Sequence, residues 1–223
     1  MPDTVKTRAY RSTVRAERAE QTRHAVLVAA RDLLVERGYD ATTVAMVAEA
    51  AGVSVDTVYV SVGRKPQLAV AAVDMVLGSS DEPVPAEQRG YVQAVRAADG
   101  ARRKLELYAA AVGDVVPRTA ALLGALRRAG EADEECARAW VAVSERRSAN
   151  MLLLAADLRG TGELRADLTD REVADLVWST NAHEYWLLLH SRGWTPERYA
   201  ALLADLWCRL LLEEQPQADP VNR

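Results

Sequence analysis

Hydroxyl, phenol and cationic side chains gather in one short stretch of the chain, from Thr42 to Lys65. The stretch reads as two short helices joined by a tight turn, which is the pattern of a helix-turn-helix. In that motif the second helix enters the major groove of DNA, where such side chains bond to base edges and backbone phosphates. The sequence therefore predicts nucleic-acid binding here. The alternative is an ordinary helical hairpin inside an all-α core.

Local signals place both helices of this stretch. The first helix has one apolar face, formed at positions i, i+3, i+4 and i+7 by Val44, Val47, Ala48 and Ala51. Thr43 is placed to cap the start of this helix, and Gly52 to end it in the left-handed conformation that favours glycine. Ser54 is placed to cap the second helix, whose inward residues include Val55 or Val58.

The flanking segments give the hairpin a frame of further helices. Residues 1–15 are basic and poor in apolar side chains, so they form either a disordered tail or an arm that meets phosphates or the minor groove. A helix over residues 16–37 precedes the hairpin and ends at Gly38. A connecting helix over residues 66–78 follows it, with Pro66 at a first-turn position.

The rest of the chain reads as helices interrupted by Gly or Pro, so an all-α fold is predicted. Residues 78–87 gather Gly, Ser and Pro and mark the domain boundary. The helices expected after it run over residues 87–98, 101–114, 117–129, 131–158, 169–192 and 195–213. The predicted organisation is a flexible basic arm at 1–15, a helix-turn-helix domain at 16–65, a connecting helix at 66–78, a C-terminal helical domain at 79–214 and a disordered tail at 215–223.

Composition bounds the class of partner and the compartment. The net charge is −4, but residues 1–66 hold ten Lys and Arg against eight Asp and Glu, so this segment is +2 and the remainder −6. Any contact with a polyanion is therefore expected at the N-terminal end. Two cysteines without a CxxC pair predict neither a disulfide framework nor a zinc site. That favours a cytoplasmic location, and no apolar run approaches the ~20 residues needed to cross a bilayer.

The last two predicted helices carry the strongest apolar pattern. In the final helix the stripe consists of Tyr199, Leu202, Leu203, Leu206, Trp207 and Leu210. The preceding helix, over residues 169–192, is apolar around most of its circumference and is expected to be buried on more than one side. One side packs on the chain's own core, and the second suggests a partner. Two such helices from each of two subunits predict a homodimer.

Over residues 23–70 the chain resembles the TetR family, the tetracycline-repressor-like regulators. The resemblance rests on Ala29-Ala30 before Leu33-Leu34, the Gly38-Tyr39 turn, Thr42-Thr43-Val44, Ala48-x-x-Ala51-Gly52-Val53-Ser54, Thr57-x-Tyr59, and Lys65 followed by Leu68. It implies a homodimeric all-α transcriptional regulator, most often a repressor, that binds a double-stranded DNA operator. It also implies that the C-terminal domain, residues 79–214, binds a small-molecule effector that lowers operator affinity.

The second helix of the predicted helix-turn-helix has few side chains suited to hydrogen bonding with base edges. Val60 suits contact with a thymine methyl group, and Asp56 carries a charge that costs affinity near phosphates. Ser61 stands where the family often has His or Tyr reaching a phosphate, so Arg64 and Lys65 are expected to supply much of the affinity. The expected DNA-binding residues are Thr42, Thr43, Ser54, Val55, Asp56, Thr57, Tyr59, Val60, Ser61, Arg64 and Lys65.

The effector site is expected among larger and polar side chains of the C-terminal domain. The candidates are Tyr91, Tyr108, Trp140, Arg147, Met151, Trp178, Asn181 and His183. Plain core packing is the alternative for the aromatic residues and for Met151. Asn181 and His183 lie on an otherwise apolar helix and are more informative, because buried polar groups need partners. Those partners are a ligand, one another across a dimer, or water.

Enzymatic chemistry has no recognisable pattern in this sequence. The three histidines share no spacing with a Ser or Cys nucleophile, and there is neither a phosphate-binding glycine loop nor HExxH. A protein that is not an enzyme and has no cofactor is therefore predicted. The acidic run at residues 133–135 reads as a solvated helix face. Two alternatives stay open: a dimeric small-molecule-binding protein with weak or lost DNA affinity, and a transcriptional activator.

Overall fold

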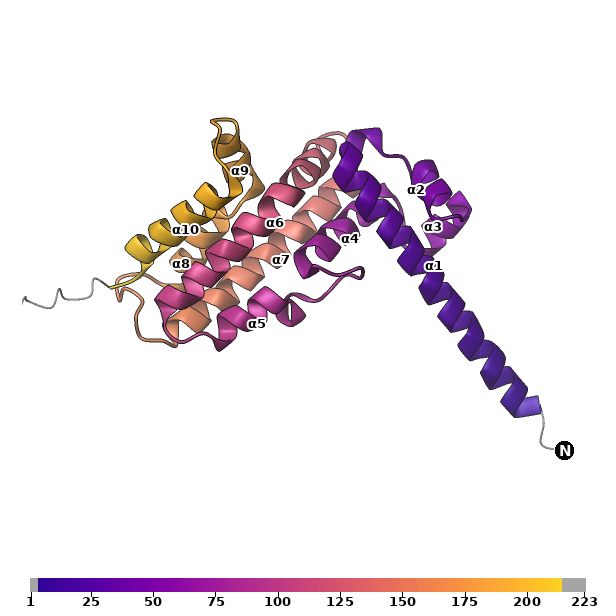
Figure 1. Cartoon of the computed structure of the whole chain (residues 1–223), viewed down its shortest axis with the longest axis horizontal. Coiled ribbons are helices and arrows are strands. Elements are labelled where there is room, and N and C mark those ends of the chain that lie inside the picture. Colours follow the sequence, from indigo (N-terminus) through magenta and orange to yellow (C-terminus); the bar gives the residue numbers. More distant parts are fainter. Residues whose placement is uncertain (1–3, 214–223) are drawn as a thin grey trace, which may run out of the picture. The chain divides into compact units, whose positions relative to one another are not determined.

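The computed structural model describes residues 4–213, with side chains from residue 15 onward. This part of the chain forms ten α-helices and one 3-10 helix (Figure 1). Its extended backbone pairs only at an isolated antiparallel bridge between Leu164 and Leu212. The predicted all-α fold is confirmed. The chain divides into two compact units: the first unit is Met1–Arg89 with Arg118–Val143, and the second unit is Gly90–Pro117 with Ser144–Arg223.

The first unit holds the predicted hairpin and its supporting helices. They are α1 (Thr4–Ala41), α2 (Val44–Ala50), α3 (Val55–Ser61) and α4 (Lys65–Gly78), followed by the 3-10 helix η1 (Ala86–Gln88). Helix α1 contacts α2, α3 and α4, and α2 contacts α3. Figure 1 shows the two short helices α2 and α3 beside α1. The helix-turn-helix therefore rests on α1, which fixes how its second helix is presented.

The core of the first unit draws on helices that are far apart in the sequence. Val26 of α1, Val58 of α3 and Leu68 of α4 are buried in one cluster. Leu126 and Cys136 join the same cluster from the end of α6 and the start of α7. The sequence placed residues 118–143 in the C-terminal domain, whereas this segment belongs to the first unit and Leu122, Leu126 and Val143 are buried in its core.

The second unit consists of the helices from α5 onward apart from the segment Arg118–Val143, and its last helix carries the apolar stripe. These helices are α5 (Gly90–Ala97), the first part of α6 (Ala101–Ala129), most of α7 (Glu134–Arg159), α8 (Asp170–Thr180), α9 (His183–His190) and α10 (Pro196–Leu211). Helix α10 begins after Thr195, whose side chain accepts a hydrogen bond from the Arg198 N–H and caps the helix. Tyr199, Leu203 and Trp207 are buried, as the stripe predicted.

The predicted helix break before Pro117 is wrong, because α6 runs through it from Ala101 to Ala129. Proline inside a helix removes one N–H, here the donor to the carbonyl of Gly113, and costs roughly 3 kcal/mol. Val112, Val115 and Ala120 on both sides of it are buried. Packing of the flanking turns therefore outweighs the local cost.

The single helix predicted over residues 169–192 is also wrong, because the backbone breaks after α8 ends at Thr180. Ala182 is extended, with φ −68° and ψ 146°. Side chains of α10 use the polar groups at this break: the Tyr199 hydroxyl donates to the Thr180 carbonyl at 3.0 Å, and the Trp207 indole donates to the Thr180 hydroxyl at 2.8 Å. The Tyr199 hydroxyl thereby replaces the backbone N–H that the Thr180 carbonyl would accept from in a continuous helix.

Other boundaries moved by smaller amounts. Helix α1 begins at Thr4, where the sequence predicted a helix from residue 16, and the side chains of residues 4–14 lie outside the described residues, as does the tail predicted at 215–223. The helix predicted at 87–98 is a 3-10 turn followed by α5.

Helix α6 is long and apolar enough to cross a bilayer by length and composition, contrary to expectation. However, 61% of its apolar window is buried inside the protein, as in the core helix of a soluble protein.

The two cysteines are both free and buried. Cys136 lies in the first unit and Cys208 in the second. Burial raises the pKa of each thiol above its ordinary value.

Candidate nucleic-acid interface

The turn of the helix-turn-helix has the predicted caps. The Thr43 side chain accepts from the Met46 N–H at 3.2 Å, and the Ser54 side chain accepts from the Thr57 N–H at 3.1 Å. Gly52 between them has φ +67°, the left-handed conformation that glycine adopts without strain. The first short helix therefore begins and ends, and the second begins, on signals in its own sequence, and the three predictions are confirmed.

The inner face of the helix-turn-helix is formed by buried residues, which are not accessible to DNA. Val58 is fully buried, so it is the inward residue of α3. Thr42, predicted as a DNA-binding residue, is also buried, and its hydroxyl donates to the carbonyls of Leu33 at 3.1 Å and Gly38 at 2.8 Å. Thr42 therefore closes the turn after α1 and is not part of the exposed face.

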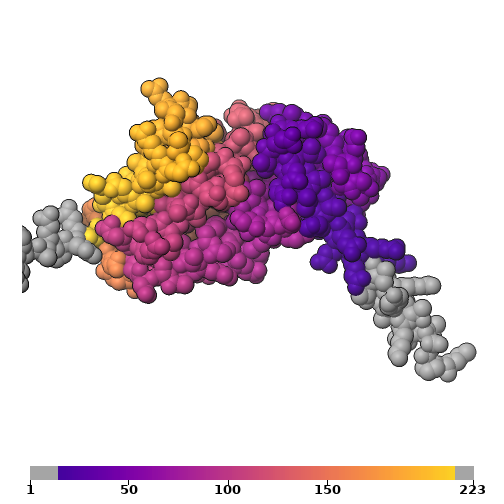
Figure 2. All heavy atoms as spheres, in the orientation of Figure 1, coloured from indigo at the N-terminus to yellow at the C-terminus, as the bar shows by residue number. Residues whose placement is uncertain are grey.

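The outer face of α3 presents Asp56, Tyr59 and Val60 to solvent, whereas Val55, also predicted to bind DNA, packs against the core. Val60 is 89% exposed and the neighbouring Tyr59 47% exposed. Asp56 is exposed in the first turn of α3, where the helix dipole stabilises its charge. In the space-filling view this violet segment forms part of the surface of the first unit (Figure 2).

Two cations follow α3 at the start of α4. The Arg64 side chain is 74% exposed, and the Lys65 ammonium lies 4.2 Å from the centre of the Tyr39 ring, a cation–π contact. The positive end of the α4 dipole adds to their charge. Arg64 and Lys65 therefore place two cationic side chains next to α3, and their contribution to DNA affinity stays a prediction.

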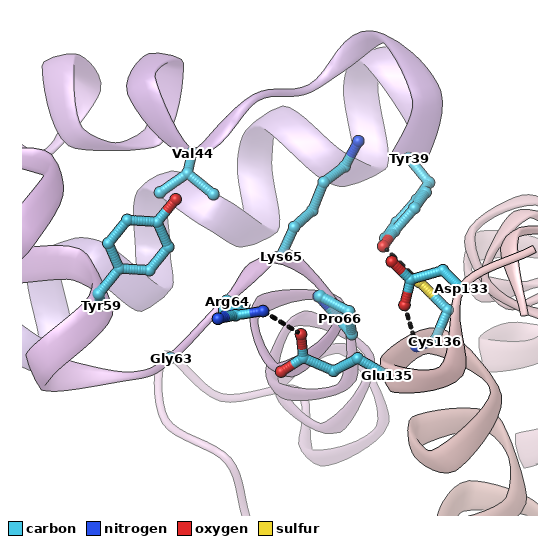
Figure 3. A pocket seen from close by; sticks show the side chains of 10 residues that line it. All are labelled: Tyr39, Val44, Tyr59, Gly63, Arg64, Lys65, Pro66, Asp133, Glu135 and Cys136. Atoms are coloured by element: carbon cyan, nitrogen blue, oxygen red, sulfur yellow. Dashed lines mark hydrogen bonds and ion pairs between the residues drawn. The ribbon is translucent and has the colours of Figure 1, made fainter.

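A depression of about 720 Å³ lies beside these cations, and we call it the α4–α7 depression. One part of its wall comes from the helix-turn-helix and the start of α4, and the other from the residues at the start of α7 (Figure 3). It is lined by Tyr39, Val44, Tyr59, Gly63, Arg64, Lys65, Pro66, Asp133, Glu135 and Cys136. Both signs of charge meet at this site.

Sequence reasoning missed the acidic side of this depression. Asp133 accepts from the Cys136 N–H at 2.9 Å, as a helix cap does, and this hydrogen bond holds its pKa below the ordinary value. The Glu135 carboxylate lies 3.3 Å from the Arg64 guanidinium and is only 24% exposed. The acidic run is therefore not a uniformly solvated face. Arg23, also missed, donates from α1 to the carbonyl of Ser61.

Most of the predicted effector residues meet in the second unit. The Asn181 side-chain amide donates to the Tyr108 hydroxyl at 2.9 Å and accepts from the Arg147 guanidinium. The same guanidinium also donates to the Trp178 carbonyl at 3.1 Å. Met151 lies 3.4 Å from the Tyr108 hydroxyl. We call Tyr108, Arg147, Met151, Trp178 and Asn181 the polar cluster. Burial raises the pKa of Tyr108 and lowers that of Arg147.

The other three candidates lie around the cluster or elsewhere. The Tyr91 ring is 6.4 Å from the Tyr108 ring. His183 is buried on α9, with its Nδ1 3.1 Å from the Glu184 carboxylate. Trp140 packs against the core of the first unit and does not join the polar cluster.

A capped two-helix turn with an exposed second helix and adjoining cations defines a helix-turn-helix protein. Comparison with protein families supports that class, because residues 26–72 match the bacterial regulatory proteins of the tetR family. The chain has the fold of a TetR-family transcriptional regulator, so the resemblance drawn from the sequence is confirmed. Regulators of this family are typically non-enzymatic DNA-binding proteins.

Solved structures with this fold cover nearly the same length of chain. A protein from Rhodococcus sp. described as a TetR-family transcriptional regulator has a TM-score of 0.67 at 19% identity, covering 87% of this chain and 100% of its own. NalD from Pseudomonas aeruginosa is the secondary repressor of the MexAB-OprM multidrug efflux pump. Its structure has a TM-score of 0.62 at 23% identity, covering 88% of this chain and 100% of its own. A regulator from Saccharomonospora viridis in complex with choline has a TM-score of 0.65 at 15% identity, covering 87% of this chain and 99% of its own. No curated protein sequence matches the chain.

Proposed function

We propose that the protein is a homodimeric, cytoplasmic transcriptional repressor that binds a double-stranded DNA operator and leaves it when a small molecule binds. The observation that carries DNA binding is the outer face of α3, where Tyr59 and Val60 project to solvent beside the exposed Arg64. In a dimer, two such helices would reach half-sites about 34–36 Å apart, one turn of DNA. NalD, which has the same fold, is a repressor.

A gel shift with the DNA flanking the protein's own gene tests DNA binding. In Val60→Asp a carboxylate replaces an 89% exposed side chain, so the fold is retained but the charge faces the phosphates. Val141→Asp makes the same change at a 51% exposed position of α7 and serves as the control. We expect a specific shift for the wild type and the control and its loss for Val60→Asp. The absence of a specific shift at low salt for the wild type would contradict DNA binding.

The polar cluster of the second unit is the proposed effector site. The Arg147 Nη2 makes both hydrogen bonds described above, whereas Nε and Nη1 make none to any residue from 15 to 213. These donors suit a carboxylate or another strong acceptor. Trp178 and Met151 supply apolar surface beside them. The expected effector therefore combines an acceptor group with an apolar body.

Tryptophan fluorescence tests this site, because Trp178 belongs to the cluster. A set of carboxylic acids and their matched primary amides is titrated into the wild type, Arg147→Gln and the exposed neighbour Arg146→Gln. An effector should change the emission and release DNA in the wild type and in Arg146→Gln, with much weaker binding in Arg147→Gln. Equal binding by all three proteins would remove Arg147 from the site.

Exposed leucines on the last helices support the proposed homodimer. Leu188 of α9 is 68% exposed and Leu210 of α10 is 39% exposed. Light scattering after size exclusion should give a dimer for the wild type and a monomer for the double variant Leu188→Glu, Leu210→Glu. Leu153→Glu, at a 59% exposed position of α7, is the control and should stay dimeric. A dimeric double variant would place the interface elsewhere.

Two results would favour the alternatives. Effector binding without any specific DNA shift favours a small-molecule-binding protein that has lost DNA affinity, to which the exposed charge of Asp56 contributes. A reporter gene that loses expression when the regulator is deleted favours an activator. A reporter that gains expression supports the repressor.

A further inference from the structure

Three side chains of the first unit form a closed network beside the α4–α7 depression. The Arg64 guanidinium lies 3.3 Å from one carboxylate oxygen of Glu135, and the Gln67 amide donates to the other at 3.0 Å. The Gln67 carbonyl oxygen in turn accepts from the Arg64 backbone N–H at 3.0 Å, which caps α4. The start of α7 is thereby joined to the start of α4 (Figure 3).

Exposure within the ion pair is uneven, and this matters for its chemistry. The Arg64 side chain is 74% exposed, whereas that of Glu135 is 24% exposed and also held by Gln67. The carboxylate is therefore the fixed member of the pair and the guanidinium the movable one. An exposed Arg can exchange one oxyanion for another without exposing or burying apolar surface.

A backbone phosphate at the candidate interface would compete for the same guanidinium. Carboxylate and phosphate both accept hydrogen bonds from Arg, so contact with one weakens contact with the other. The negative charge of Glu135 would also repel a phosphate that approaches Arg64. A partly exposed ion pair is weak enough for a phosphate to displace, and its loss changes an equilibrium constant by up to about fivefold.

We propose that Glu135 sets the DNA affinity of the protein by holding Arg64 as an internal counter-anion, which a DNA phosphate must displace. This inference rests on the proposed DNA binding. It assigns to Glu135, a residue outside α3, the role of limiting the DNA affinity. When Arg64 leaves Glu135 for a phosphate, the freed carboxylate takes up a salt cation, and this uptake offsets part of the counterion release from the DNA.

The neighbouring glutamate provides a matched control. Glu134 lies in the same turn of α7 and its side chain is 93% exposed, paired only with Arg138 at i+4 among the residues that the structure describes. Glu134→Gln and Glu135→Gln change the net charge equally, so a difference between them reports the Arg64 contact. Thermal melts of both variants establish that they remain folded.

Fluorescence anisotropy of labelled DNA over a series of salt concentrations is the main measurement. We expect Glu135→Gln to bind about two- to fivefold more tightly than Glu134→Gln at low salt. Its plot of log affinity against log salt should be steeper by up to about 0.9, the value for one phosphate. In an Arg64→Ala background, Glu135→Gln should give no such gain. Equal affinities of the two single variants, weaker binding by Glu135→Gln, or a gain that persists without Arg64 would overturn the proposal.

A second measurement separates this proposal from the proposed function. Elution from a heparin column needs no operator, and Glu135→Gln should elute at higher salt than Glu134→Gln, with the difference absent in Arg64→Ala. If the wild type gave no specific DNA shift while the heparin order held, DNA binding would be wrong but the Arg64–Glu135 exchange would stand. If the shift occurred without the heparin order, Glu135 would not restrain Arg64.

Discussion

Close packing between α6 and α10 gives a sharp prediction at Gly113. A Cβ added at this position would lie 2.6 Å from the Cβ of Ala200 and 3.1 Å from the carbonyl oxygen of Pro196. Carbon atoms in contact are normally ~3.5–4.0 Å apart, so the two helices must separate by roughly 1 Å. The backbone at Pro196 cannot rotate away as a flexible side chain would. Gly113→Ala therefore forces the first turn of α10 to move.

The size of the effect follows from two opposing terms. Overpacking of this kind costs about 1–3 kcal/mol, whereas alanine is favoured over glycine in a helix by about 1 kcal/mol. The expected net destabilisation is about 1 kcal/mol, or about 2–4 °C in Tm for a chain of this size. The sign is opposite to that of a Gly→Ala change in an uncrowded helix.

A double-mutant cycle with Ala200→Gly isolates the clash. Ala200→Gly alone should destabilise by about 1 kcal/mol through helix propensity, but in the Gly113→Ala background it removes the 2.6 Å contact. The double variant should therefore be more stable than the sum of the single changes predicts, by about 1 kcal/mol or more. Urea denaturation followed by circular dichroism measures all four proteins. Additivity within about 0.3 kcal/mol would refute the close approach.

Three further changes test separate parts of the molecule. Lys65→Ala should lower the slope of log DNA affinity against log salt by about 0.9 if Lys65 neutralises one phosphate, and an unchanged slope in anisotropy titrations would exclude that contact. Thr180→Val should destabilise by about 1–3 kcal/mol and change tryptophan emission, since it leaves the Trp207 indole N–H without its acceptor; a neutral result in denaturation would show that water replaces it. Hydrogen bonds from Thr169 hold the pKa of Glu172 below its ordinary value of 4.5, so this carboxylate stabilises the fold above that value and the gain is lost as pH falls through the lowered pKa. Thr169→Ala removes the hydroxyl hydrogen bond but keeps the larger contribution from the backbone N–H, so it should raise the Glu172 pKa in part in an NMR titration, and an unshifted pKa would reject the hydroxyl as a contributor.

Sequence reasoning succeeded where the signal is local. Thr43, Gly52 and Ser54 act within three or four residues of their own positions, so their capping roles are visible in the sequence and confirmed in the structure. The apolar stripe of α10 is also local, because its period is fixed by helix geometry. Side chains at regular spacing need no knowledge of their tertiary neighbours to be assigned to one face.

Failures occurred where distant contacts override local preference. Pro117 marks a helix start in isolation, but it lies inside α6 because the turns around it are buried. The break at Ala182 is accompanied by hydrogen bonds from α10 to Thr180. The sequence near residue 182 gives no sign of these bonds. In the candidate site, Glu135 and Arg64 are 71 residues apart, so the acidic run gave no sign of its counter-ion. Thr42 was likewise assigned by type to the exposed face, whereas its hydroxyl is used inside.

The two buried thiols give the native chain a built-in pair of chemical reporters. A thiol reacts as the thiolate, and Cys136 and Cys208 are both shielded from reagent and held at a raised pKa while their surroundings stay closed. Alkylation must therefore wait for local opening. Since one thiol lies in each unit, the rates at which the two are alkylated compare the opening of the two units within one molecule. Mass spectrometry of the labelled peptides would show which unit an added DNA fragment or effector holds closed, with no engineered probe.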